Sequence, residues 1–229
     1  MIDERDRDKF YQNILSATLP RLVPTKRHKE GCVGEKFLDL VIEYGMPLKQ
    51  AEPQIGDNIA GWACLTEGFM EEYRIPMEKI RRESRKNLMA FSKAHSFLQV
   101  AEQMGCKLSQ EEKLELQNGM MPPFLILRVD DDDYGAAAAL DGVLMQMLAN
   151  EYRSDLYVLF SSIYEAMVMP VSAGMTTEEL EAMHCFIQEQ EVSENERLSD
   201  RIYIYHRATH TIEIVGGDPD DPNHSYQYE

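Results

Sequence analysis

Residues 154–170 read SDLYVLFSSIYEAMVMP, and this stretch decides the class of fold. Two apolar runs rich in strand-forming residues, 156–160 and 164–171, are separated by Ser161 and Ser162. Apolar runs of this length that are bounded by turn residues are typical of buried strands. The stretch therefore predicts a strand, a break and a second strand, and it places a sheet in the C-terminal half of the chain.

Helices and further strands surround this pair. The apolar spacing and the capping residues predict strands at 124–129, 201–206 and 211–215, and helices at 141–152 and 176–190, with residues 136–140 forming either a short strand or the entry to a helix. The N-terminal half predicts helices at 3–18, 67–73, 76–91, 97–104 and 109–117, a buried strand at 37–44 and a second strand within 55–65. Helices and strands interleave, so the expected fold class is α/β or α+β, with a mixed sheet flanked by helices in two packed modules.

Composition, charge and turn residues all change between positions 105 and 123. Asn118-Gly119 and Pro122-Pro123 interrupt any regular element there. The sequence thus predicts a helix and strand module at 1–105, an acidic helix and linker at 106–122 and a mixed-strand module at 123–215. Residues 216–229 lack apolar periodicity, so we expect them to form a mobile acidic tail.

The charge of the chain is strongly uneven. The 229 residues carry 23 Lys and Arg against 40 Asp and Glu, a net charge of −17. Residues 1–100 hold 16 basic and 15 acidic side chains (net +1), whereas residues 101–229 hold 7 and 25 (net −18). Such a balance argues against general binding of nucleic acid, and it indicates either a strongly anionic face or a solvated acidic surface.

The sequence predicts a soluble cytoplasmic protein. No apolar run approaches the roughly 20 residues needed to span a bilayer, and the first ten residues, MIDERDRDKF, contain no apolar leader. The four cysteines, Cys32, Cys64, Cys106 and Cys185, occur singly, without the close pairs of a zinc site. We therefore expect them to be reduced, buried, small apolar residues, and we expect no metal and no cofactor.

Two groups of side chains are candidates for chemistry at the predicted breaks. Ser161 and Ser162, followed by Glu165, lie where a nucleophilic serine would need an adjacent base and an elbow of the type G-x-S-x-G. Neither is present, so the serines are expected to satisfy the backbone of the turn. Asp130, Asp131, Asp132 and Asp133 offer oxygen ligands for a divalent cation, but consecutive side chains on an extended chain point alternately, which favours a solvated turn.

Two further groups are basic. His206 and His210 flank a predicted hairpin turn, where two imidazoles without a third ligand make a weak metal site. Four cations on one predicted helix, Arg81, Arg82, Arg85 and Lys86, are suited either to phosphate or, more simply, to solvent and intramolecular ion pairs.

The C-terminal half resembles the bacterial DUF5688 family, whose function is uncharacterised. The resemblance rests on YGAAAAL, on SDLYVLFSSIYEAMVMP and on LSDRIYIYHRATHTIEI, and it is best over residues 134–206. The matching positions are Gly135, Ala136, Ala137, Asp155, Tyr157, Leu159, Ser161, Ser162, Glu165, Leu198, Ser199, Asp200, Tyr203 and Tyr205. Phe160 and Tyr164 depart from the family pattern, which has Pro and His there. A second uncharacterised family, DUF1444, is similar in layout. The resemblance implies a fold and no activity.

Two functions from different classes follow from these observations. The first is a non-enzymatic protein whose anionic C-terminal face binds a basic or nucleic-acid-binding protein, in a sharper version as an inhibitor that mimics nucleic acid. The alternative is an enzyme or a small-ligand-binding protein with a cleft near Ser161, Ser162, Glu165 and Asp200.

Overall fold

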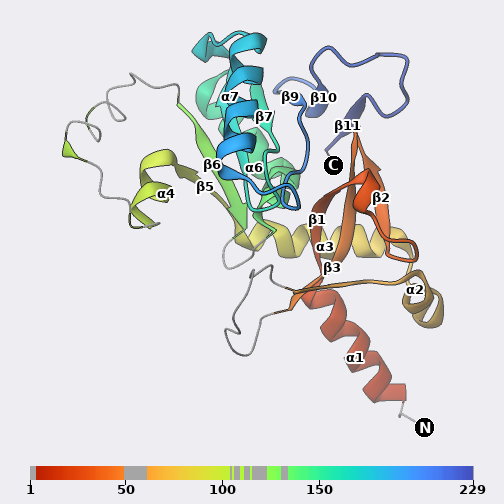
Figure 1. The fold of residues 1–229 in the computed structure, drawn as a ribbon. Helices are drawn as coiled ribbons and strands as arrows, with labels where there is room; N and C mark the ends of the chain where they lie inside the picture. The colour runs from red at the N-terminus through yellow and green to blue at the C-terminus, as the bar shows by residue number, and fades with distance from the viewer. Residues whose placement is uncertain are drawn as a thin grey trace.

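The computed structural model describes residues 4–48, 61–103, 105, 109, 110, 114, 123–129 and 134–228. In this part of the chain the strands form two sheets, and every strand pairing is antiparallel. Figure 1 shows helices packed around both sheets, with α1 projecting away from them toward the N-terminus. The predicted α+β class is confirmed, and the antiparallel pairing selects it over α/β.

The smaller sheet is built from the N-terminal region. Helix α1 (Glu4–Ala17) leads into β1 (Leu19–Pro24), and the 3₁₀ turn η1 (Thr25–Arg27) is followed by β2 (Gly34–Phe37), β3 (Leu40–Leu48) and β4 (Gly61–Cys64). Strand β3 is central and pairs with the other three. The single strand predicted at 37–44 is wrong, because Leu38, with φ of 55°, and Asp39 form a tight turn that divides it into β2 and β3.

The larger sheet has seven strands in the order β11-β10-β9-β7-β8-β6-β5. Its strands are β5 (Ser92–Ser96), β6 (Leu125–Val129), β7 (Leu156–Leu159), β8 (Ala166–Pro170), β9 (Ile202–His206), β10 (Thr211–Ile214) and β11 (Ser225–Gln227). Strand β5 follows directly on helix α3 (Met77–Phe91), so the N-terminal region contributes an edge strand to the C-terminal sheet. Helices α2 (Glu67–Tyr73) and α4 (Phe97–Gln103) lie where the sequence predicts them, whereas most of 109–117 is outside the described residues.

Side chains alternate between two cores along the central strands. Leu159 and Ile202 pack with Leu180 of helix α7 (Thr177–Glu191) on one face. On the other face the core includes Val158 and Tyr203 together with residues of α3, of the 3₁₀ helix η2 (Gly135–Leu140) and of helix α6 (Gly142–Tyr152). The period of two in a strand therefore places α7 on one side of the sheet, and α3 and α6 on the other.

Of the two alternatives for residues 136–140, the structure has the entry to a helix, because the segment Gly135–Leu140 leads directly into Asp141, the N-cap of α6. This segment is a 3₁₀ helix in which all six residues are buried. A Cβ at Gly135 would lie 2.2 Å from the carbonyl oxygen of Tyr164. The close approach of these two backbones requires glycine at this position.

The structure differs from the predicted mobile tail at residues 225–228. Strand β11 pairs with β10, and the buried Tyr228 donates a hydrogen bond of 2.8 Å to the carbonyl oxygen of Ala139. Tyr226 and Tyr228 are two residues apart and their rings lie in edge-to-face contact, 5.5 Å between centroids. These aromatic side chains supply apolar area that the polar composition of the segment conceals.

The prediction of reduced, buried cysteines is wrong for three of the four. Cys32 and Cys64 form a disulfide with their Cα atoms 5.8 Å apart, although 32 positions separate them in sequence. Cys185 is a free thiol on the exposed side of α7, and Cys106 lies outside the described residues. The disulfide joins the start of the β2 hairpin to the end of β4.

Polar and aromatic contacts tie the two sheets together. The carboxylate of Asp39, in the β2–β3 turn, accepts hydrogen bonds from the hydroxyls of Ser199 (2.8 Å) and Tyr203. The ring of Phe37 packs edge-on against Phe160 and Tyr226, with centroids 6.0 and 4.9 Å away. The C-terminal segment therefore lies between the sheets, as Figure 1 shows.

Candidate functional site

Ser161 and Ser162 continue β7 beyond its last assigned residue. The amide of Leu198 donates to the carbonyl oxygen of Ser161 at 3.4 Å, and Ser162 forms an isolated bridge with Arg197. The hydroxyl of Ser162 accepts a hydrogen bond of 3.2 Å from the amide of Tyr164, which is the turn-stabilising role predicted for it. Only 5% of the surface of each serine is exposed, so neither hydroxyl is open to a substrate.

Glu165 and Asp200, two other predicted site residues, are more exposed than these serines. Burial raises the pKa of Glu165, and Arg128, whose Nε lies 3.9 Å from a carboxylate oxygen, opposes this. The side chain of Asp200 is 89% exposed and lies 3.9 Å from the Nε of Arg201. The two hollows described below are lined by other residues, and residues 130–133 lie outside the described part of the chain.

His184 is an unusual side chain that sequence reasoning missed. With Leu180 and Gln188 it forms the buried face of α7, and only 1% of its surface is exposed. The amide nitrogen of Gln188 donates to the carbonyl oxygens of Ser161 (3.3 Å) and Ser199 (2.8 Å), which holds α7 against the sheet. The spacing of 180, 184 and 188 along one helix face was the signal available in the sequence.

The ring nitrogens of His184 and the hydroxyl of Ser161 find no hydrogen-bond partner among the described residues. Burial lowers the pKa of His184 to about 4, although the charge of Asp200 acts in the opposite direction. The ring is therefore neutral at physiological pH. A catalytic base must reach a substrate, and this imidazole is enclosed between α7 and the sheet.

The two histidines of the β9–β10 hairpin do not form a pair. The ring nitrogens of His206 contact carboxylate oxygens of Asp155 (3.2 Å) and Glu213 (3.1 Å), while His210 occupies the turn with φ of 58°. Burial lowers the pKa of His206, but the hydrogen bonds to Glu213 and Asp155 outweigh it, and the net shift is upward. The described residues contain no group of three or more His, Cys, Asp or Glu suited to a metal ion.

A buried ion cluster lies in the smaller sheet. The carboxylate of Glu43 is fully buried and accepts hydrogen bonds from Arg21 (2.6 and 2.9 Å) and contacts Nδ1 of His28 at 2.9 Å. The guanidinium of Arg21 lies over the rings of Trp62 (4.8 Å) and Tyr134 (4.9 Å). The charged groups of Arg21 and Glu43 pair with each other, and the Arg21 guanidinium also contacts Tyr134 next to η2, so the cluster fixes the sheet against the start of η2.

The exposed face of α7 is acidic. No Lys or Arg occurs between positions 171 and 196. All five glutamates of the helix are exposed: Glu178, Glu179, Glu181, Glu189 and Glu191. Phe186 lies among them with 63% of its surface exposed. Thr176 and Glu179 cap the helix in a reciprocal pair of hydrogen bonds.

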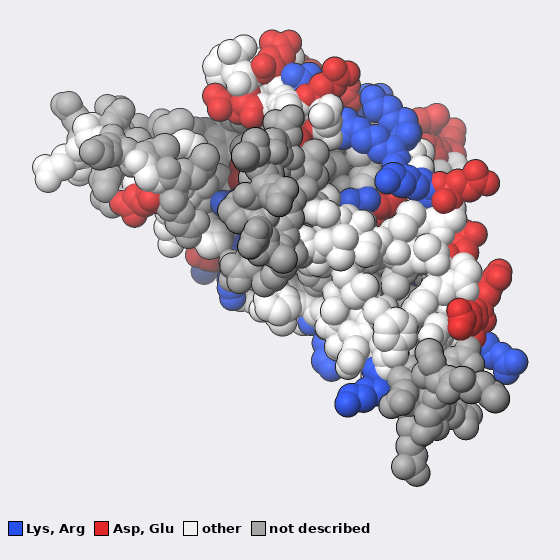
Figure 2. All heavy atoms as spheres, turned by 60° about the horizontal axis from the view of Figure 1, so that its bottom comes forward, with Lys and Arg blue, Asp and Glu red and all other residues white. Residues whose placement is uncertain are grey.

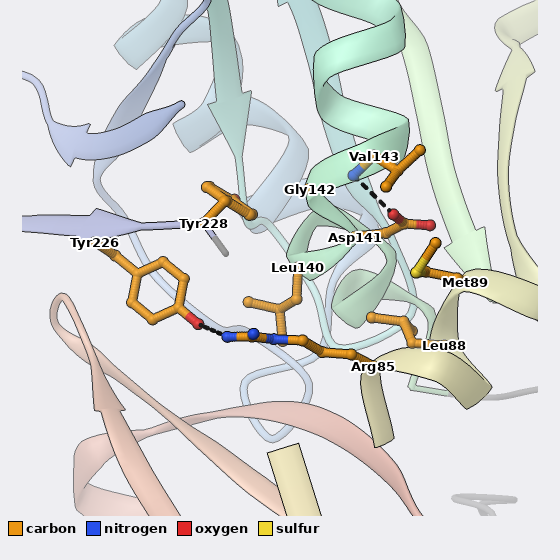
Figure 3. A pocket seen from close by; sticks show the side chains of 9 residues that line it. All are labelled: Arg85, Leu88, Met89, Leu140, Asp141, Gly142, Val143, Tyr226 and Tyr228. Atoms are coloured by element: carbon orange, nitrogen blue, oxygen red, sulfur yellow. Dashed lines mark hydrogen bonds between the residues drawn. The ribbon is translucent and has the colours of Figure 1, made fainter. Parts of the chain in front are cut away.

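The basic face of α3 lines two adjoining hollows. The larger, of about 490 Å³, is open and is lined by Glu78, Arg81, Arg82, Arg85, Lys86 and Met89. The smaller, of about 40 Å³, also includes Arg85 and Met89 and reaches Asp141, Val143 and the tyrosines of the C-terminal segment (Figure 3). The predicted intramolecular pairing is present, because Arg81 contacts Glu35 at 2.6 Å and Arg82 contacts Glu83 at 3.1 Å.

Figure 2 shows how the charges are spread over one side of the molecule. Red carboxylate and blue basic side chains lie around the margins of a broad white area without charged groups. The net charge of −17 is therefore not a uniform coat of acid on this side.

These features define an α+β protein with two antiparallel sheets, a helix with an acidic outer face and a second helix with a basic one. The chain belongs to the family described as "Family of unknown function (DUF5688)", which matches residues 7–207. The resemblance seen in the sequence is thus confirmed. No curated protein and no solved structure matches the chain. No helix in the described part of the chain has the length and apolar character needed to cross a bilayer.

Proposed function

We propose that this protein is a non-enzymatic binding protein whose exposed α7 face engages a basic segment of a partner protein. The observation that carries the proposal is the outer face of α7, with five exposed glutamates, no Lys or Arg within the helix and the exposed ring of Phe186. Opposite charges accelerate encounter and fix orientation, and an aromatic side chain supplies an apolar anchor.

Helix stability alone does not explain this distribution of charge. Glu178 and Glu179 lie in the first turn of α7, where the helix dipole favours anions. Glu189 and Glu191 lie at the other end, which the dipole makes unfavourable for carboxylates, and the last turn has no basic residue to compensate. A binding role for the acidic C-terminal end of α7 accounts for residues that cost the isolated helix stability.

The spacing of the carboxylates favours a basic peptide segment as the occupant over mimicry of nucleic acid. Five glutamates between 178 and 191 span roughly 20 Å of helix, or about one charge per 4 Å. Duplex DNA carries about one charge per 1.7 Å of axis. The lower charge density of α7 suits a partner segment with scattered Lys and Arg side chains. The exposed ring of Phe186 would enter an apolar pocket of that segment between those side chains.

The test is capture of partners from host lysate on the purified protein at 50 mM salt, followed by elution at 500 mM salt and identification by mass spectrometry. Wild-type protein is expected to retain a basic protein that the high-salt step releases. The double variant Glu181→Lys with Glu189→Lys should lose that protein, and Phe186→Ala should retain less of it. The double variant Glu67→Lys with Glu71→Lys is the matched control, since both glutamates are exposed on α2 and their replacement changes the net charge by the same amount.

Two results would overturn the proposal. One is capture of the same protein by the α7 double variant and by wild type in equal amounts. The other is binding that is unchanged between 50 and 500 mM salt, because an interface of this kind weakens as salt screens it.

A further inference from the structure

The face of the larger sheet opposite α7 carries a surface of the opposite character. We name it the α3–α6 surface and define it by Arg82, Arg85, Lys86 and Met89 of α3 with Val143 and Met147 of α6. Because α7 packs on the other side of the sheet, a partner on one surface does not cover the other.

The basic part of this surface reaches solvent. The side chain of Arg82 is 71% exposed, and that of Lys86 is exposed one turn further along α3. Arg85 lies between the two hollows, with its guanidinium 3.4 Å from the hydroxyl of Tyr226 (Figure 3). The ion pair of Arg82 with Glu83 lies at the exposed surface, where such pairs contribute little and exchange readily.

The apolar part adjoins it directly. Met89 and Val143 line the same small cavity, as Figure 3 shows, and each has about half of its surface exposed. Met147 lies one turn beyond Val143 on α6 and is 62% exposed. Exposed methionines such as Met89 and Met147 are typical of surfaces that adapt to apolar side chains of a partner.

We propose that the α3–α6 surface binds an acidic peptide segment with apolar anchors, supplied by a partner protein. Arg82, Arg85 and Lys86 complement its carboxylates, and Met89, Val143 and Met147 receive its apolar side chains. This site goes beyond the proposed function of α7 and makes the protein an adaptor with two faces of opposite charge.

The composition of the surface favours a peptide over a polyanion. Glu78 lines the larger hollow and Asp141 lines the smaller, and both repel a dense row of phosphates. The net charge of −17 repels any anion at long range, and it repels a nucleic acid more strongly than a short peptide because the nucleic acid carries more charges. The apolar half of the surface would also remain uncovered by inorganic phosphate.

The experiment measures fluorescence anisotropy of a labelled synthetic peptide of roughly 15 residues, with Leu at helical spacing and Glu between. We expect saturable binding to wild type that weakens about tenfold in Arg82→Glu, in Lys86→Glu and in Met147→Gln. The matched control is Lys79→Glu, on the same helix, because the Lys79 ammonium lies 4.6 Å from the Tyr11 ring centre and lines neither hollow. This control should bind like wild type, as should Glu181→Lys with Glu189→Lys on the opposite face.

The result that overturns the proposal takes one of three forms. In the first, wild type fails to bind the peptide. In the second, Arg82→Glu and Lys79→Glu weaken binding equally, so that the loss reflects only the change in net charge. The third form is displacement of the peptide by inorganic phosphate together with wild-type affinity in Met147→Gln, which would make the surface an anion site. Thermal unfolding of each variant confirms that a loss of binding is not a loss of fold.

Discussion

The buried ring of His184 makes the stability of the fold dependent on pH. Burial lowers the pKa of the imidazole to about 4, with Asp200 opposing, from the ordinary value of 6.5. The unfolded chain therefore binds the proton more tightly than the folded one. The contribution of the neutral His184 ring to the free energy of unfolding is therefore complete above pH 6.5. It falls as the pH decreases from 6.5 to 4, and it is absent below pH 4. At 1.36 kcal/mol per pH unit, this interval corresponds to a loss of about 3 kcal/mol.

The assay is urea unfolding at pH 7, 6, 5 and 4, for wild type and for His184→Leu. Leucine fills a similar volume, does not titrate and leaves no polar atom without a partner in this interface. The carboxylates titrate alike in both proteins, so the difference between the two free energies of unfolding isolates His184. Between pH 7 and pH 4 the free energy of wild type should fall by about 3 kcal/mol more than that of the variant.

A histidine of opposite behaviour provides the control. The pKa of His206 is raised overall, so its contribution is present below pH 6.5 and is lost as the pH rises through the higher folded value. The difference between wild type and His206→Gln should therefore change with the opposite sign over the same series. The reasoning about His184 is refuted if wild type and His184→Leu lose stability in parallel, or if the ring titrates near 6.5 by NMR in the folded protein.

Three further predictions concern the framework. Tyr203→Phe removes a hydrogen bond to the carboxylate of Asp39 and should lower the free energy of unfolding by about 2 kcal/mol, measured in urea. Cys64→Ser opens the disulfide with Cys32 and should lower the free energy of unfolding by about 3 kcal/mol. Alkylation without reductant, read by mass spectrometry, should label one additional thiol in this variant, and labelling of both Cys32 and Cys64 in wild type would contradict the pairing. Gly45→Ala would place a Cβ 2.4 Å from a carbonyl oxygen of the adjacent strand, so thermal unfolding should show a loss of about 2 kcal/mol, and wild-type stability would contradict the close approach.

Local patterns predicted the elements whose formation is local. The run 156–170 forms β7, the break at the serines and β8, and Thr176 caps α7 as expected. In both cases turn chemistry and apolar periodicity agree with the tertiary contacts. The hairpin of β9 and β10 was also predictable, because two alternating runs flank a short polar turn.

The edge strands were not predictable, because pairing rather than composition defines them. Strand β1 contains Pro20 and Pro24, which discourage a strand assignment, yet at the edge of a sheet a missing N–H is tolerated. Strand β5 reads SKAHS, with no aromatic or β-branched residue, and β11 follows an acidic turn. Each acquires its conformation from the neighbouring strand.

The candidate sites were likewise predictable where their contacts are local and unpredictable where they depend on tertiary packing. The role of Ser162 in the turn followed from its position, whereas the enclosure of His184 depends on how α7 packs on the sheet. The disulfide between Cys32 and Cys64 joins residues far apart in sequence, and no spacing rule connects them. The separation of the acidic face of α7 from the basic face of α3 was not predictable, because it depends on the sheet that lies between the two helices.

The contact of Phe37 with Tyr226 has a consequence for synthesis on the ribosome. Phe37 emerges early, but Phe160 and Tyr226, which cover its ring, are translated far later, Tyr226 among the last four residues of the chain. At about 5–20 residues per second, the wait for Tyr226 is roughly ten to forty seconds. Throughout that interval the nascent N-terminal sheet exposes the part of the Phe37 ring that Tyr226 later covers, so the smaller sheet is translated well before the side chains that complete its packing.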